Sequence, residues 1–285
     1  MNRELNFSGP SPILYLIATP IGNLSEFSPR AIEVVKSCDY VAAEDTRNSG
    51  KLLSLFSIKK PFISCHEHNE EESSSRIVSL LKEGKKVCYM SDAGYPAISD
   101  PGSRLVANCL SNGIKVATVS GPNAALNALA SSGLDSTHFY FFGFLSAKEG
   151  DKAKELDDLK KRRETIILYE SPHRIKKTLK SLLESFGDRR AVIGRELTKA
   201  HEEFIRGTLA EFVLLDEQTL KGEMVIVIEG VKQEEKPADE ETIKQALLDC
   251  IKAGLSGKDA VEKTAKSLQV RKKTVYSLYL ELNQN

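Results

Sequence analysis

Five short segments of this sequence carry the residue types that chemistry needs, and each follows an apolar run typical of a buried strand. Charged, hydroxyl and amide side chains occur in them beside glycine and proline, which fix backbone geometry. The segments are TPIGN (19–23), EDTR (44–47), CHEHN (65–69), SDAGYP (91–96) and SGPNAA (120–125). In one such loop, glycine and proline could serve only to shape a turn. Five of them together predict a shared ligand site.

The apolar runs before these segments predict the strands that position them, with helical segments between. Ser28-Pro29 predicts the start of one helix, and Asp100-Pro101 predicts the start of another that Gly113 ends. This alternation predicts a parallel α/β sheet with its ligand beyond the carboxyl ends of the strands. The expected strands are ILYLIA (13–18), DYVAA (39–43), PFIS (61–64), KVCYM (86–90) and KVATV (115–119).

The alternation resumes in the second half of the chain. We predict two α/β domains, residues 1–120 and 121–235, although a (βα)8 barrel would give the same alternation. A charged stretch with proline at 231–241 predicts a linker, and 241–285 predicts a small helical tail. The expected strands here are HFYFFGFL (138–145), TIILY (165–169), RAVIG (190–194) and MVIVIEG (224–230).

Composition excludes several classes of protein. The 285 residues have zero formal net charge and five cysteines without a CxxC pair, and no apolar run is long enough to span a bilayer. The first twelve residues lack the apolar segment of a signal peptide, so we expect a cytoplasmic protein that does not bind membranes. Neither a GxGxxG nor a Walker A pattern is present, which disfavours dinucleotides and nucleoside triphosphates. Apolar walls without a phosphate cradle would suit a zwitterionic ligand that carries an uncharged adenine.

Two of the segments allow specific alternatives. EDTR could be a helix N-cap with a surface ion pair rather than a working site. Cys65, His66 and His68 lie close together, but no second cluster with metal-ligand spacing accompanies them, so we expect no metal. A serine hydrolase is disfavoured because the sequence has no GxSxG elbow.

Eight motifs, in order, cover nearly the whole chain: ATPIGNL, AAEDTR, SDAGYPAISDPG, SGPNAA, FFGFL, YESPHRI, RELTK and GEMVIVIEG. In these motifs the chain resembles the 16S rRNA (cytidine 2′-O)-methyltransferases of the tetrapyrrole methylase superfamily. The resemblance implies S-adenosylmethionine (SAM) held between two α/β domains. It also implies a cytidine ribose in the decoding region of 16S rRNA, within the small ribosomal subunit, as methyl acceptor, and a homodimer in the bacterial cytoplasm.

The resemblance also implies which residues contact SAM. The sequence departs from the family pattern at Tyr95, Ser120 and Asn123, where the family usually has Thr, Pro and often Ser. All three lie in the expected SAM-binding segments. The expected SAM-binding residues are Pro20, Ile21, Gly22, Asp92, Gly94, Tyr95, Ser120, Gly121, Asn123, Ala124 and Tyr169.

Methyl transfer to a ribose hydroxyl requires in-line alignment, exclusion of water and a proton acceptor. Asp45, Glu170 and Glu196 are the candidates for that acceptor, and Arg47 joins them as a catalytic candidate. Asp45 and Arg47 could instead only fix their own loop. Arg47, Arg174, Arg195 and Lys199 could hold phosphates beside the target nucleotide.

The tail predicts a small helix-turn-helix. Residues 252–273 hold seven Lys or Arg against two acidic residues, and Arg271, Lys272 and Lys273 are candidates for RNA contact. Dimerisation or capping is the alternative role for this tail. Two rival functions stay open: a superfamily methyltransferase acting on a tetrapyrrole or another small molecule, and a DNA-binding regulator, suggested by the tail alone.

Overall fold

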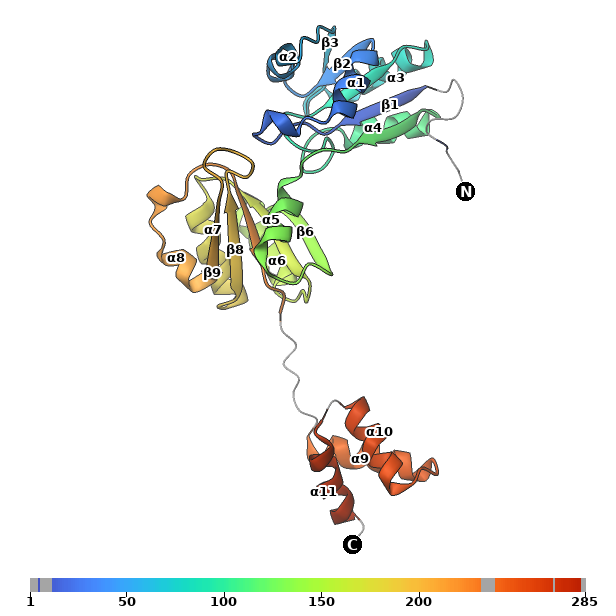
Figure 1. Cartoon of the computed structure of the whole chain (residues 1–285), viewed down its shortest axis with the longest axis vertical. Helices are drawn as coiled ribbons and strands as arrows, with labels where there is room; N and C mark the ends of the chain where they lie inside the picture. Colours follow the sequence, from blue (N-terminus) through green and yellow to red (C-terminus); the bar gives the residue numbers. More distant parts are fainter. Residues whose placement is uncertain (1–4, 6–11, 232–238, 269, 283–285) are drawn as a thin grey trace. The chain divides into compact units, whose positions relative to one another are not determined.

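The computed structural model describes Leu5 and residues 12–231, 239–268 and 270–282. The chain forms two compact units, Met1–Val231 and Lys232–Asn285. Residues 232–238, which include most of the predicted linker and the predicted boundary at 235, lie outside the described residues. The first unit contains two separate five-stranded sheets, one after the other along the chain (Figure 1), so the barrel alternative is ruled out.

The first sheet is parallel throughout, as the alternation of strands and helices predicts. Its strand order is β3-β2-β4-β1-β5, so β1 and β4 pair near its centre. The carboxyl ends of all five strands therefore meet at one edge, where the five chemical segments follow them. The strands are β1 Ile13–Ile17, β2 Tyr40–Ala43, β3 Phe62–Ser64, β4 Val87–Met90 and β5 Lys115–Val119.

Helices cover both faces of this sheet. One apolar core includes Ile77 and Leu105 from α3 and α4, and the other includes Val35 and Leu53 from α1 and α2. The Ser28 hydroxyl accepts a hydrogen bond from the Ala31 amide (3.1 Å), which confirms the predicted start of α1. The elements are η1 Leu24–Glu26, α1 Pro29–Ser37, α2 Thr46–Leu55, α3 Glu70–Lys82 and α4 Ser103–Ser111.

The predicted start of α4 was wrong. The helix begins at Ser103 with Gly102 as N-cap, so Asp100 and Pro101 precede it. The buried carboxylate of Glu70 takes the capping role, because its Oε1 accepts from the amides of Gly102 (3.0 Å), Arg104 (3.0 Å) and Leu105 (3.2 Å). A cap supplied from another helix leaves no local sequence signal.

The second sheet is mixed, with order β6-β7-β10-β8-β9. Only β6 and β7 run parallel, because β10 pairs antiparallel with β7 and β8, and β8 with β9. Strand β9 is not among the predicted strands, because its sequence, EFIRGT, has two charged residues, no fully buried side chain and no continuous apolar run. The strands are β6 Phe139–Phe144, β7 Thr165–Glu170, β8 Arg190–Arg195, β9 Glu203–Thr208 and β10 Met224–Ile228.

Helices cover this sheet on both faces as well. Ala128 and Leu129 of α5 pack on Ile167, Val192 and Val225, while α6, α7 and α8 contribute to the larger core opposite. The elements are α5 Ala124–Ser132, α6 Glu149–Leu159, α7 Ile175–Phe186, α8 Leu209–Leu214 and η2 Glu217–Thr219.

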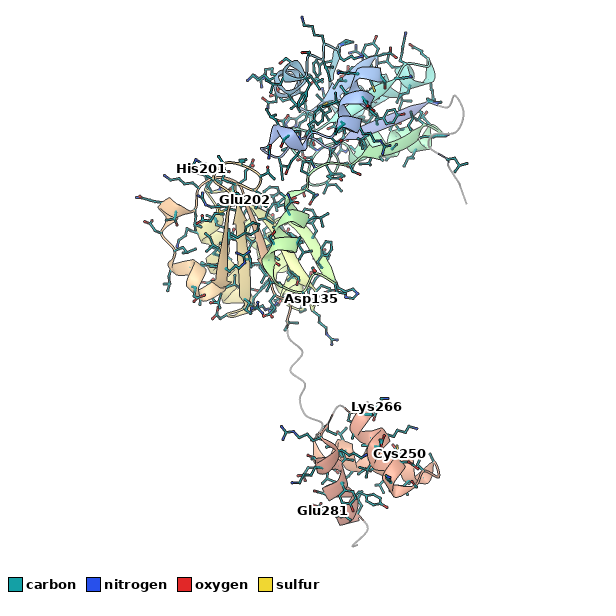
Figure 2. The ribbon with its side chains drawn as sticks, in the orientation of Figure 1. Asp135, His201, Glu202, Cys250, Lys266 and Glu281 are labelled. Carbon is teal, nitrogen blue, oxygen red and sulfur yellow. The ribbon has the colours of Figure 1, made fainter. Side chains whose placement is uncertain are left out.

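The C-terminal unit is a bundle of three helices, α9 Glu240–Lys252, α10 Gly257–Ser267 and α11 Lys272–Leu282. Val275 and Leu278 pack with Leu247 and Val261 in its core. Helix α9 thus adds a third member to the predicted helix pair. Figure 2 shows charged side chains such as Lys266 and Glu281 standing on its surface. Across the described part of the chain, no helix is both long and apolar enough to cross a bilayer.

Candidate functional site

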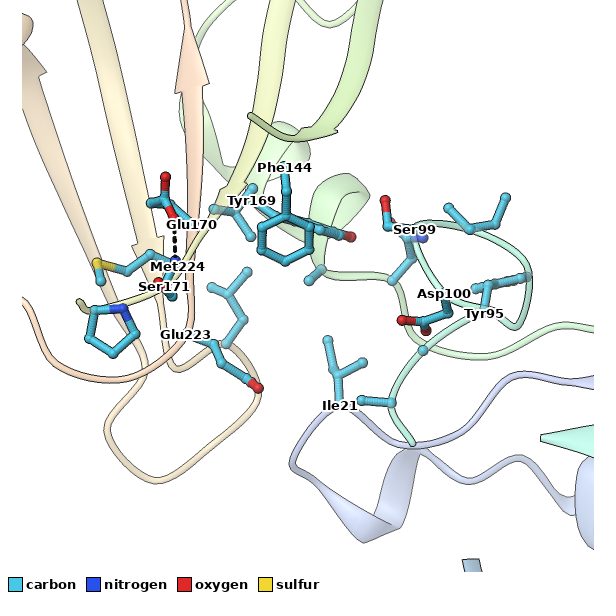
Figure 3. A pocket seen from close by; sticks show the side chains of 18 residues that line it. Ile21, Tyr95, Ser99, Asp100, Phe144, Tyr169, Glu170, Ser171, Glu223 and Met224 are labelled. Carbon is cyan, nitrogen blue, oxygen red and sulfur yellow. Dashed lines mark hydrogen bonds between the residues drawn. The ribbon is translucent and has the colours of Figure 1, made fainter. Parts of the chain in front are cut away.

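A cavity of about 330 Å³ lies between loops of the two sheets of the first unit (Figure 3). This size falls in the lower part of the range for small-molecule sites, ~300–1,000 Å³. One wall consists of Ile21 and residues 93–95 and 98–100, which follow β1 and β4. The other consists of residues 123–124, 144, 169–172, 197 and 223–225, at the start of α5 and the ends of the second sheet.

Backbone hydrogen bonds join the TPIGN loop to the SDAGYP loop. The amide of Thr19 donates to the Gly94 carbonyl (2.9 Å), and the Gly94 amide donates to the Thr19 carbonyl (3.1 Å). The Thr19 hydroxyl also donates to the Ser91 carbonyl (3.2 Å). Gly94 has φ +76°, a conformation that favours glycine. Together these contacts hold the backbone of the SDAGYP loop open to the cavity.

A hydrogen bond also joins the SGPNAA loop to the SDAGYP loop. The Tyr95 hydroxyl accepts it from the amide of Gly121 (3.2 Å). Gly121 lies so close to Ala18 that a Cβ on it would be 2.9 Å from the Ala18 Cβ. The Asn123 carboxamide oxygen caps α5 by accepting from the Leu126 amide (2.9 Å). The departure at Tyr95 therefore has a role in joining two loops, and Asn123 serves as an N-cap as the serine frequent in the family could.

An aromatic surface forms part of the second wall. The rings of Phe144 and Tyr169 meet edge to face with centroids 5.5 Å apart, and the centroids of Phe141 and Tyr169 are 5.1 Å apart. Phe144 is 51% exposed, which is unusual for a phenylalanine next to a core. Burial is the main cause that raises the pKa of Tyr169. The two rings, inclined at 62° to each other, give the cavity an aromatic surface against which a planar ring could pack.

The structure places the expected SAM-binding residues in two groups. Ile21, Gly94, Tyr95, Asn123, Ala124 and Tyr169 line the cavity. Pro20, Gly22, Asp92, Ser120 and Gly121 belong to the same loops but do not line it. Pro20 is buried, whereas Ser120 is exposed.

Asp45 and Arg47 form an ion pair at the start of α2. The guanidinium donates to Asp45 Oδ1 through Nε (3.1 Å) and to Oδ2 through Nη2 (2.7 Å), while Asp45 Oδ1 also caps the Arg47 amide (2.8 Å). These hydrogen bonds lower the pKa of Asp45 to about 2. The next residue, Asn48, donates to Asp92 (2.9 Å), which links EDTR to the SDAGYP loop. EDTR thus has both the helix N-cap and the surface ion pair that were the alternative to a working site. The Arg47 side chain is nevertheless 84% exposed.

Glu170 is buried at the end of β7 and fully engaged. Its oxygens accept from the Ser171 amide (2.8 Å) and the Thr178 hydroxyl (2.6 Å), the first of which Figure 3 draws. Arg174 lies 3.6 Å from the same carboxylate and donates to the Leu145 carbonyl (2.7 Å). Both side chains thus hold the ends of β6 and β7 together.

Glu196 and Lys199 belong to the β8–β9 connection, whose His201 and Glu202 are labelled in Figure 2. Lys199 Nζ donates to Glu196 and to Glu223 (3.0 Å each). The Lys199 side chain also lies over Gly22, where an added Cβ would clash with it. Glu196 has φ +49°. This network therefore connects the second sheet to the TPIGN loop of the first.

The remaining RNA candidates are Arg195, whose side chain is hydrogen-bonded within the protein, and three exposed residues of the C-terminal unit. Arg195 donates to Glu203 (2.6 Å) and to the Lys221 carbonyl (2.9 Å). Arg271, Lys272 and Lys273 are exposed at the start of α11, and Lys272 pairs with Glu262 of α10 (2.7 Å).

Sequence reasoning missed several cavity residues, among them Asp100, Phe144 and Glu223. The sequence pattern assigns Asp100 to a helix start, and FFGFL enters only as part of an expected strand and as a family motif. Burial, and next the charge of Glu44, raise the pKa of Asp100 to about 6. A shifted carboxyl in a cavity is a common mark of a working group, but only the structure brings these residues together.

Among the described residues, no group of three or more His, Cys, Asp or Glu side chains could hold a metal ion. The pair His66 and His68 lies with ring centroids 6.0 Å apart, and Cys65 is buried.

Comparisons with known proteins identify the family to which this chain belongs. Residues 13–213 match the family described as Tetrapyrrole (Corrin/Porphyrin) Methylases. A ribosomal RNA small subunit methyltransferase I of Bacillus subtilis is 45% identical over 98% of both chains. Proteins of the same name from Halalkalibacterium halodurans and Synechocystis are each 43% identical, over 93% and 95% of this chain and 94% and 98% of their own lengths.

Two solved structures share the fold at low identity. A uroporphyrin-III-C-methyltransferase from Thermus thermophilus has a TM-score of 0.56 at 20% identity, and a cobalt precorrin-4 methyltransferase has 0.59 at 19%. Each covers 76% of this chain and 94% of its own. At these identities the likeness establishes the fold alone.

Proposed function

This chain belongs to the tetrapyrrole (corrin/porphyrin) methylases and, within them, to the ribosomal RNA small subunit methyltransferases I, and on this premise we propose a specific reaction. The protein transfers a methyl group from SAM to the 2′-hydroxyl of a cytidine in 16S rRNA. The observation that carries the proposal is 40–45% identity to curated relatives of that name over nearly the full length of the chain.

The cavity supports SAM as the methyl donor. Its first wall presents backbone groups of a stiff loop, and its second presents the Phe144–Tyr169 face, which suits a purine. The cavity residues include carboxylates and no Lys or Arg, which suits a donor with a cationic sulfur better than a phosphate. When bound, SAM would supply a methyl group already activated by the positive sulfur.

The chain's own residues would bind, orient and exclude water. Ile21 and Tyr95 on one wall and Tyr169 on the other would hold the donor. Arg47, exposed and fixed by Asp45, would bind an RNA phosphate beside the target nucleotide. Asp45 itself is a poor base, because a carboxylate with a pKa of about 2 has little affinity for a proton.

Glu170, Glu196, Arg174, Arg195 and Lys199 take positioning roles in this proposal. Their side chains are at most 36% exposed and already have protein partners, so binding RNA would require those hydrogen bonds to break, whereas Arg47 is 84% exposed. They would keep the ends of the second sheet and the β8–β9 connection in place around the cavity. The C-terminal unit would add RNA affinity through Arg271, Lys272 and Lys273.

The proposal extends to the setting of the reaction. By the family resemblance, the acceptor is the decoding region of the small ribosomal subunit, and the enzyme works as a homodimer in the cytoplasm. A tetrapyrrole acceptor is disfavoured, because the structures named for such substrates are only 19–20% identical to this chain.

The experiment that tests this function has two arms. Calorimetry in EDTA should detect SAM binding to the purified protein. Labelled SAM should then transfer methyl to small ribosomal subunits that lack the modification and leave uroporphyrinogen unlabelled. Labelling of uroporphyrinogen instead of RNA would refute the proposed acceptor, and absence of SAM binding would refute the donor.

A further inference from the structure

Three carboxylates line the cavity, Asp100, Glu170 and Glu223. Both oxygens of Glu170 accept hydrogen bonds from its own domain, and the carboxylate is almost fully buried. Glu223 pairs with Lys199 (3.0 Å), and its side chain is 81% exposed. Asp100 has no ion-pair partner among the described residues. Of the three, it is therefore the one with capacity to take a proton from a bound substrate.

The fold holds Asp100 in place by a strained loop. Ala97 and Ser99 have φ +67° and +59°, unusual for residues with a side chain. The loop closes through the Ala97 amide, which donates to the Pro101 carbonyl (3.1 Å). Glu70 caps α4 in place of Asp100, so the Asp100 carboxylate is free to line the cavity. Strain of this kind persists where the surrounding structure fixes a functional conformation.

The surroundings of Asp100 favour its protonated form. Burial, then the charge of Glu44, and also that of Asp92, raise its pKa, while a hydrogen bond from Ser91 opposes this. The other titratable groups that face it are Tyr89 on β4 and Tyr169 on β7. If Asp100 accepted a proton, its negative charge would be lost, and its repulsion by the carboxylates of Glu44 and Asp92 would be relieved.

We propose that Asp100 is the catalytic residue that accepts the proton of the ribose 2′-hydroxyl. The inference rests on the proposed function. In the step, the bond between the 2′-oxygen and the methyl carbon forms while the carbon–sulfur bond breaks, and the bonding electrons leave with sulfur, which becomes neutral. The hydroxyl proton moves to the Asp100 carboxylate, so charge and atoms balance.

The first test is single-turnover methyl transfer to small ribosomal subunits at saturating SAM. Asp100→Asn should slow transfer by about 10²-fold or more, because an amide cannot accept the proton. Glu72→Gln, a change of the same kind at an exposed site on α3, is the matched control and should keep the wild-type rate.

A pH profile separates a proton acceptor from a residue that only shapes the loop. The wild-type rate should fall on the acid side as Asp100 becomes protonated. Glu44→Gln removes a neighbouring negative charge and lowers the pKa of Asp100, so its acid limb should move to lower pH. An acid limb unmoved in Glu44→Gln would contradict the proposal, even if Asp100→Asn failed to fold.

Calorimetry supplies a readout that does not depend on activity. Near pH 6, a positive sulfur beside Asp100 should lower the pKa of this carboxyl and release protons on SAM binding. S-adenosylhomocysteine, whose sulfur is neutral, should release fewer. Buffers of different ionisation enthalpy measure this difference, and Asp100→Asn should abolish it.

The outcomes distinguish this inference from the function on which it rests. A wild-type protein without RNA methylation would overturn both. An active wild type with a full rate in Asp100→Asn would overturn only the role of Asp100. Equal proton release with both ligands would place Asp100 near a group that SAM and its product share, and would also overturn it.

Discussion

The two sheets of the first unit contribute different kinds of surface to one cavity. The parallel first sheet contributes a loop with positive φ at Gly94, and Asp100, a carboxylate without an ion-pair partner among the described residues. The mixed second sheet contributes aromatic and apolar side chains such as Phe144, and its carboxylates Glu170 and Glu223 are already paired. The first wall thus suits the charged part of a methyl donor and the second a planar ring. The contrast indicates that substitutions on the first wall should reduce SAM affinity and activity more than substitutions on the second.

Apart from Asp100→Asn, the largest expected effect concerns Arg47, at the charged edge of the first sheet. Arg47→Ala should lower kcat/KM for the ribosomal substrate by roughly ten- to a hundredfold, because a charge-assisted hydrogen bond to the RNA can no longer form. Asp45→Asn should lower it less, because the guanidinium remains. The Kd for SAM should stay within about twofold in both variants. Lys51→Ala, an exposed cation further along α2, is the control. Wild-type kinetics in Arg47→Ala would show that Asp45 and Arg47 serve only to fix their own loop.

Gly94→Val should weaken SAM binding about tenfold. A β-branched side chain at φ +76° costs ~1–2 kcal/mol, and its methyl groups would crowd Ile21, 3.5 Å from the added Cβ. Gly84→Val is a matched control, because Gly84 has φ +84° with open space around it and lies outside the cavity. Calorimetry on both variants measures the effect. Equal SAM affinity in wild type and Gly94→Val would remove this loop from the site.

The C-terminal unit offers a charged surface in place of a cavity wall. Replacing Arg271, Lys272 and Lys273 together by Ala should weaken binding to the small ribosomal subunit severalfold at low salt, with SAM affinity unchanged. The slope of log K against log salt should become shallower by about 2, which is ~0.7 for each RNA phosphate that a cation no longer neutralises. Identical salt slopes would refute RNA docking and favour a dimerisation or capping role.

On the second wall, Phe144→Ala should weaken SAM binding about fivefold, since an aromatic contact contributes ~1 kcal/mol. Phe139→Ala is the matched control, because Phe139 lies on the same strand, is similarly exposed at 42% and does not line the cavity. A reduction of SAM affinity that is equal in both variants would indicate a general effect on β6.

The smallest expected effect is on stability. Asp100 has a raised pKa of about 6 in the folded chain against 3.8 ordinarily, so its charged form opposes folding. This cost is absent below pH ~4, develops between the two values and is complete above ~6. Asp100→Asn should therefore be more stable than wild type at pH 8, by about 1 kcal/mol because the partly solvated carboxyl is screened. Denaturant unfolding at pH 4 and pH 8 measures the difference, and an equal gain at both would refute the electrostatic explanation.

The first sheet was more predictable than the second for a physical reason. In a parallel sheet every strand delivers its carboxyl end to the ligand edge, so strand patterns could locate the SDAGYP loop, which carries Gly94 and Tyr95. Strand β10 runs antiparallel to β7, so its amino end lies at the cavity. Glu223 and Met224 therefore line the cavity although they do not follow the carboxyl end of a strand. No local pattern reveals the direction of a buried strand.

Helix caps illustrate a second limit. Ser28 caps α1 from its own sequence position, as predicted. Asp100-Pro101 has the same signal, yet Glu70 caps α4 from a distant helix. Only the folded structure reveals that substitution, and with it the exposure of Asp100 to the cavity.

The proposed methylation of a cytidine ribose in small-subunit RNA can be tested by mass mapping of that RNA from a strain without this protein. We expect one cytidine in the decoding region to lack a single ribose methyl group in that strain, and the wild-type gene to restore it. Small-subunit RNA with an unchanged set of methylated nucleotides would refute the proposed reaction.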